Sequence, residues 1–72
     1  MALVKNVRIV DDMLNYQKNV TYMDVSFSRN LFHIKTYKSN DPNREGPASQ
    51  NIMMERPEAE ALYAALGQFL QG

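Results

Sequence analysis

Three side chains in the middle of the chain, Asp24, Ser26 and His33, are of the types that carry out nucleophilic catalysis. In a Ser–His–Asp arrangement the histidine takes the serine proton and the carboxylate orients the imidazole. A hairpin with Ser26 opposite His33, and Asp24 one diagonal step away, would bring the three together. An open sheet, however, offers no oxyanion hole and does not exclude water. We therefore expect a polar outer face of a hairpin, and not an enzyme.

A second pattern, residues 41–46, resembles the start of a calcium-binding loop of the EF-hand type. It has oxygen-bearing side chains at alternate positions and glycine at the sixth. The twelfth position of such a loop needs a bidentate glutamate and here is Ile52. One histidine and no cysteine argue against a zinc site and exclude disulfides. The sequence therefore indicates a solvated turn, with no metal and no cofactor.

The side chains named above are positioned by residues 22–38, which predict one tight β-hairpin because apolar and polar residues alternate on both sides of Arg29-Asn30. A two-residue turn at 29–30 sets a single register in which both faces pair sensibly. The predicted pairs are Tyr22 with Tyr37, Asp24 with Lys35, Val25 with Ile34, Ser26 with His33, and Phe27 with Phe32. Arg29 does not favour a primed turn, so a four-residue loop with the same pairs is also open.

Further strands are predicted on both sides of the hairpin. Residues 2–10 read as a first strand, with apolar side chains on both of its faces. Residues 11–19 are either a polar connection or a continuation of that strand past a bend, and the pattern does not decide between them. Residues 39–49 form a long loop rich in proline, asparagine and glycine. A fourth strand follows at about 49–55.

A helix opens at Arg56-Pro57-Glu58, since proline fits the first helical position and glutamate favours the positive end of the helix dipole. Its apolar side chains recur at helical spacing over an arc of about 160°. They are Ala59, Leu62, Tyr63, Ala65, Leu66, Phe69 and Leu70. We predict an α+β fold in a single domain of residues 1–72. It is a four-stranded antiparallel sheet with one C-terminal helix packed across its apolar face, in the order ββββα.

Aromatic and basic side chains gather on the outer face of the predicted hairpin and in the adjoining loops. The candidate partner-binding residues are Tyr22, Arg29, His33, Lys35, Tyr37, Arg44 and Met53. This composition is typical of protein interfaces, where tyrosine, methionine and arginine are enriched. It also suits single-stranded nucleic acids, whose bases stack on aromatic rings. The pattern leaves both partners open.

Several other apolar side chains have no obvious place in a small core. They are Val4, Val10, Met13, Leu14, Met53 and Tyr63. Contiguous apolar surface on a small domain marks a partner site, unless those residues complete the core of a monomer. A 72-residue chain without disulfides has a thin core, and oligomerisation is the most available supplement. We therefore expect a homodimer or a higher homo-oligomer.

The overall charge and hydropathy limit the other partners. Eight basic and eight acidic residues balance to zero, whereas strong nucleic-acid binders usually carry a basic excess. The chain contains no run of 18 apolar residues, so no membrane span is expected. The first residues lack the apolar region of a signal peptide, and we expect a cytoplasmic protein.

The run from Phe32 to Tyr37, then Ile52, then residues 58–70, resembles the closing strands and helix of transcription-coactivator PC4-like domains. The resemblance covers about half the chain. It implies a ββββα plan, a dimer, and single-stranded DNA bound on a curved sheet. The chain departs from that family in its few strand-end lysines and in a loop without a basic cluster.

These observations lead to one functional expectation and one alternative. The first is a small non-enzymatic binding module that acts through protein–protein contacts as a homo-oligomer. Its size and neutral charge suit an accessory regulator or inhibitor of the kind that phages encode. The alternative is a single-stranded nucleic-acid-binding protein of PC4-like architecture.

Overall fold

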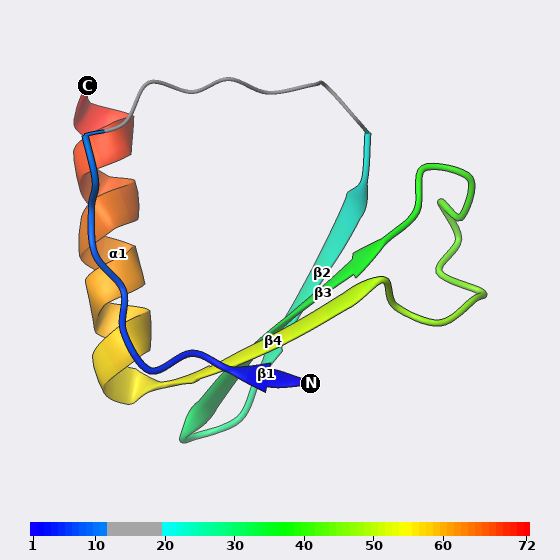
Figure 1. Ribbon diagram of the computed structural model, residues 1–72, viewed down its shortest axis with the longest axis horizontal. Coiled ribbons are helices and arrows are strands. Elements are labelled where there is room, and N and C mark those ends of the chain that lie inside the picture. The colour runs from blue at the N-terminus through cyan, green and yellow to red at the C-terminus, as the bar shows by residue number, and fades with distance from the viewer. Residues whose placement is uncertain (12–19) are drawn as a thin grey trace.

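The chain folds as an α+β structure in the order ββββα, which confirms the predicted class. The structure is a computed structural model, and it describes residues 1–11 and 20–72. Its elements are β1 (Ala2–Leu3), β2 (Tyr22–Phe27), β3 (Leu31–Tyr37), β4 (Gln50–Glu55) and α1 (Arg56–Gln71). The strands form one sheet in the order β1-β4-β3-β2, with α1 at one end of it (Figure 1). The open question about residues 11–19 falls almost wholly outside the described residues.

The sheet is mixed, and the predicted purely antiparallel arrangement is wrong at β1. Ala2 pairs with Ile52 and Leu3 with Met53 in parallel, and the Val4 N–H donates to the Met53 carbonyl at 2.8 Å. Because β1 runs parallel to β4 and pairs with it from Ile52 onward, only a few residues of β4 remain before it ends at Glu55 and the helix begins. The partner strand ends there, so the predicted strand over 2–10 is limited to two residues.

The central hairpin has the predicted register. Every pair from Tyr22 with Tyr37 to Phe27 with Phe32 is observed. The Ser28 N–H donates to the Leu31 carbonyl at 2.9 Å, which closes the two-residue turn at Arg29-Asn30. A primed turn needs a positive φ in the turn, and among the described residues Arg44 alone has one. Arg29 and Asn30 therefore do not form a turn of the primed type. The arginine is therefore accommodated without a left-handed conformation.

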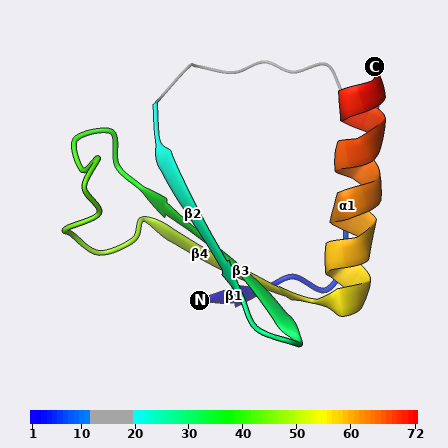
Figure 2. The ribbon, with the colours of Figure 1, turned by 180° about the vertical axis from the view of Figure 1, so that it is seen from behind.

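The helix begins where the sequence predicts, but it does not lie across the sheet. Glu55 ends β4 and Arg56 begins α1, with no connecting residue between them. A helix that folded back over the sheet would need a loop to reverse its direction. Instead α1 rises steeply from the end of β4 (Figure 2). It contacts β3 and β4 but not β2 in the part of the chain described.

The core of this arrangement is small. Only two apolar side chains among the described residues are buried, Met54 at 4% exposed and Tyr37 at 8%. Met54 lies near the junction of β4 and α1, and Tyr37 lies at the other end of β3, where the long loop begins. The stability of the chain therefore depends on a few residues at two separate places.

Candidate functional site

An apolar concavity, here called the groove, lies between α1 and the face of the sheet from which α1 rises. Successive strand residues point to opposite faces, so the observed register puts one set of apolar side chains on this side. From the sheet the groove includes Met23, Val25, Phe27, Phe32, Ile34, Ile52 and Met54. From α1 it includes Ala59, Leu62, Tyr63 and Leu66, and Phe69 and Leu70 follow on the same face of the helix by their spacing.

The walls of the groove are largely exposed because α1 leaves the sheet after its first turns. Phe27 at the end of β2 is 78% exposed, and Phe69 in the last turns of α1 is 77% exposed. Tyr63, near the middle of the helix, is 81% exposed. Residues 61–72 contain no charged side chain, which is unusual for a helix that faces water. The apolar side chains in this half of the helix are therefore largely uncovered in the described chain.

Two cavities mark the closed end of the groove. One has a volume of about 250 Å³ and is lined by Phe32, Ala59, Leu62, Tyr63 and Leu66. Its lining is almost wholly apolar and aromatic. This shape and lining fit a single large apolar side chain.

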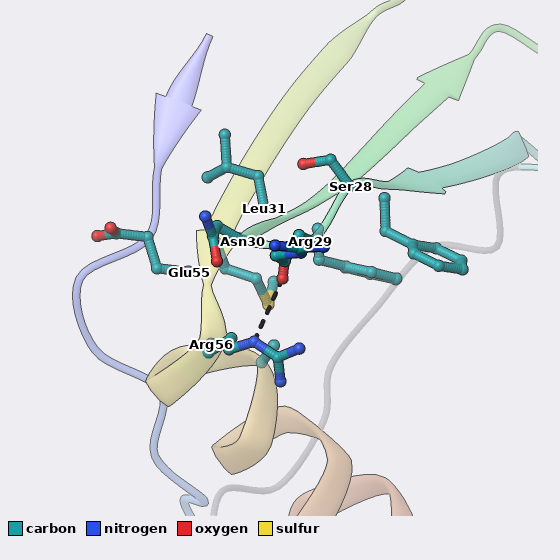
Figure 3. Close-up of a pocket in the computed structure, with 10 residues that line it drawn as sticks. Ser28, Arg29, Asn30, Leu31, Glu55 and Arg56 are labelled. Carbon is teal, nitrogen blue, oxygen red and sulfur yellow. Dashed lines mark hydrogen bonds between the residues drawn. The ribbon is translucent and has the colours of Figure 1, made fainter.

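The second cavity, of about 170 Å³, lies under the hairpin turn where the turn meets the start of α1. Figure 3 shows Arg56 directed from the first turn of α1 toward the turn residues. Its Nε donates to the Arg29 carbonyl at 3.2 Å. This bond joins the tip of the hairpin to the base of the helix and so helps to fix the angle of the groove.

The opposite side of the sheet, here called the outer face, is partly covered by the long loop. Arg44 in this loop donates from Nε to Asp24 Oδ1 at 3.0 Å, and its Cζ lies 5.2 Å from the centre of the Tyr22 ring. The φ of Arg44 is 57°, a left-handed value that costs a residue with a side chain about 1 kcal/mol. The ion pair and the cation–π contact offset that strain, and they hold the loop against β2.

The loop is organised by its first aspartate. The Asp41 carboxylate accepts from the Glu45 N–H at 2.9 Å and from the Gly46 N–H at 3.0 Å. The Arg44 N–H donates to the Asp41 carbonyl at 3.2 Å. The residues that resemble a calcium loop thus form a turn closed by one carboxylate. Within the described ranges no three histidine or acidic side chains are grouped as metal ligands.

Two of the three residues that suggested a catalytic arrangement, His33 and Asp24, are engaged with other partners. Ser26 does face His33 across the hairpin, as expected. The His33 Nε2, however, lies 3.2 Å from Asn51 Oδ1 on β4, and Asp24 is paired with Arg44. The carboxylate is thereby directed to the loop and not to the imidazole.

The structure brings some of the candidate partner-binding residues together and separates others. Tyr22, His33, Lys35 and Met53 lie on the outer face and are half-buried, with Arg44 beside them. Arg29 is exposed at the hairpin turn, at the opposite end of β2 from Tyr22.

Tyr37 lies on the outer face opposite Tyr22, as predicted, but the expectation that its ring is exposed there is wrong, because this side chain is one of the two that are buried among the described residues. It lies beside Tyr22 and at the entrance to the loop, and its carbonyl accepts a hydrogen bond from the Thr21 hydroxyl. Tyr37 therefore belongs to the core.

Sequence reasoning missed the groove, although it detected an excess of apolar residues. Of that set, Tyr63 and Val10 are exposed, whereas Val4 and Met53 are half-buried. Met13 and Leu14 are outside the described residues. A clearer indication of the groove was the stretch 61–72, which carries no charged side chain. A helix that packs on one sheet normally keeps charges on its other face.

Comparison with known proteins found no match to this chain among family models, curated proteins or solved structures. In the part of the chain that the structure describes, α1 is too short and too polar to cross a bilayer.

Proposed function

We propose that this protein is a cytoplasmic, non-enzymatic binding module that acts as a homodimer and contacts its protein partner through the groove. The supporting observation is the apolar cavity beside the exposed Tyr63 ring, together with two further exposed rings, Phe27 on the sheet and Phe69 on α1. Aromatic side chains in the centre of a concave apolar surface are the usual anchors of protein interfaces. The role that follows is that of an accessory regulator or inhibitor.

The exposed rings of the groove supply part of the free energy that such a role requires. Each ring can bury roughly 150 Å² or more, and apolar burial contributes about 25 cal/mol per Å². Three rings therefore provide on the order of 10 kcal/mol before the costs of association, which are of similar size. Because these costs offset most of the gain, the three rings alone give only weak binding, and a micromolar complex needs further contacts from the partner.

The groove also indicates the chemistry of its partner. Its helical wall carries no charge over residues 61–72, and the cavity lined by Phe32, Leu62 and Leu66 accepts one bulky apolar side chain. An amphipathic helix meets both conditions, because it presents apolar anchors at intervals of three or four residues. The partner we propose is a protein segment of that kind.

A selection of helical peptides displayed on phage tests this proposal. Peptides selected on the wild-type protein should share apolar anchors at i and i+4, and their affinity should fall about tenfold or more on Tyr63→Ala. Tyr22→Ala, which removes the same ring from the outer face, should change the affinity less than about twofold. Peptides that respond to Tyr22→Ala and not to Tyr63→Ala would place the binding surface on the outer face and refute the groove.

A second candidate function, binding of single-stranded nucleic acid on the outer face, is favoured by one observation. The Arg44–Asp24 ion pair neutralises the carboxylate that would repel phosphate, and Lys35 lies on the same face, one diagonal step from Tyr22, with His33 two residues farther along β3. Lysines near phosphates and a ring under a base are the elements that such sites use.

Fluorescence anisotropy of a labelled oligonucleotide tests this candidate. Binding should weaken steeply between low and physiological salt and should weaken further in Lys35→Ala. Lys5→Ala removes a lysine outside the sheet and serves as the control. Absence of binding even at low salt would remove the candidate.

A further inference from the structure

The outer edge of β2 is an open strand edge that nothing in the described chain covers. β2 is last in the sheet order β1-β4-β3-β2, and it pairs one-to-one with β3 over all six of its residues, without a bulge. It contains no proline and no lysine, the residues that commonly protect such edges. Its one charged side chain, Asp24, is paired with Arg44. Figure 1 shows β2 in cyan along this free side of the sheet.

The hairpin geometry shows which backbone groups point to this edge. The Ser28 N–H donates to the Leu31 carbonyl, and in an antiparallel pair every second residue shares this orientation. Ser26 and Asp24 therefore direct their N–H and C=O groups toward β3. Met23, Val25 and Phe27 direct theirs outward, where an added strand would bind.

We propose that two copies of this chain pair antiparallel through their β2 edges, with Val25 opposite Val25 on the two-fold axis. In this register Met23 lies opposite Phe27, and Asp24 lies opposite Ser26. The three residues with outward backbone groups then form about six hydrogen bonds between the copies. The homodimer itself is part of the proposed function, and the inference specifies the surface that joins its subunits.

The side chains favour a second copy over an unrelated strand. The sequence around Val25 alternates apolar and polar residues in both directions, so it is complementary to itself in this register. A shift that centred the axis on Asp24 would place two carboxylates opposite each other, which is destabilising. The proposed register avoids that repulsion and pairs a thioether with an aromatic ring on the apolar side.

The pairing has a consequence for the groove. A two-fold axis perpendicular to the sheet keeps the apolar faces of both copies on the same side. The product is one continuous eight-stranded sheet, with an α1 helix at each end and Phe27 and Met23 of both copies in contact across the middle. Two side chains that are more than half exposed in the single chain thereby gain partners.

A charge exchange at the axis tests the register. Wild-type protein in multi-angle light scattering should approach twice its 8.3 kDa mass as its concentration rises. Val25→Lys and Val25→Glu should each raise the dimer dissociation constant by about tenfold or more, because like charges then meet on the axis. An equimolar mixture of the two variants should recover the dimer. Val25 is 55% exposed, so each single chain tolerates the charge, and circular dichroism checks that it folds.

Val25→Pro provides a second test, since it removes an outward N–H and leaves the hydrogen bonds to β3 in place. It too should yield a folded monomer. A wild-type protein that stays monomeric at all concentrations would overturn both the inference and the homodimer. A dimer that persists unchanged in Val25→Lys and Val25→Pro would overturn the β2 pairing and leave the homodimer standing on another surface.

Discussion

Replacing Tyr37 by alanine should greatly destabilise the fold. Tyr37 is 8% exposed, and truncation of a buried aromatic side chain costs about 3–5 kcal/mol. A domain of this size has a free energy of unfolding of roughly 4–11 kcal/mol, at 0.05–0.15 kcal/mol per residue. Tyr37→Ala therefore removes about a quarter or more of the total.

The same substitution at Tyr63 is the matched control, because that ring is 81% exposed. Tyr63→Ala should change the free energy of unfolding by no more than about 0.5 kcal/mol, helped by the higher helix propensity of alanine. The measurement is urea denaturation followed by circular dichroism. With a slope of about 1 kcal/mol per molar urea, the midpoint of Tyr37→Ala should fall by roughly 3–5 M.

Two protein concentrations are needed, because the midpoint of a dimer depends on concentration. If Tyr37→Ala and Tyr63→Ala differ by less than about 1 kcal/mol, Tyr37 is not a core residue. The view that stability rests on two small buried clusters would then be wrong.

Three further substitutions probe local features. Gly67→Ala should raise the free energy of unfolding by about 0.5–1 kcal/mol, because the new methyl group meets no atom within 4 Å and alanine favours a helix; a lower melting temperature would show that Gly67 is needed for a close contact. At Arg44, glycine should be more stable than alanine by about 1 kcal/mol, because both lose the ion pair and only glycine relieves the left-handed backbone. Equal melting temperatures for the two variants would argue against that strain. Asp41→Ala should cost about 1 kcal/mol and accelerate hydrogen exchange at the Glu45 and Gly46 amides, which lose their acceptor; unchanged exchange by NMR would contradict this role.

The hairpin was predictable because two independent patterns fixed it. The apolar pairs and the polar pairs both fit one register, and a slip by one residue would have exchanged the two faces. The start of α1 was predictable for a similar reason, since Pro57 suits the first turn of a helix and would break one farther in. In both cases the information is local in the chain.

The misplaced features depend on contacts between distant segments. Nothing in the alternation of residues 2–10 states whether that strand runs parallel or antiparallel to its neighbour, or where the neighbour ends. The burial of Tyr37 follows from its place at the entrance to the long loop, which the strand pattern does not encode. The position of Arg44 over Tyr22 depends on a left-handed arginine that no sequence rule anticipates.

The direct junction of β4 and α1 has a consequence for insertions at this point. The helix has no linker, so the extended backbone of Glu55, with φ −86° and ψ 176°, sets the direction in which it leaves the sheet. One residue inserted after Glu55 would rotate every later helical side chain by about 100° around the helix axis. Tyr63 and Leu66 would then turn away from Phe32, so the length of this junction, more than the identity of its residues, keeps the two apolar walls facing each other.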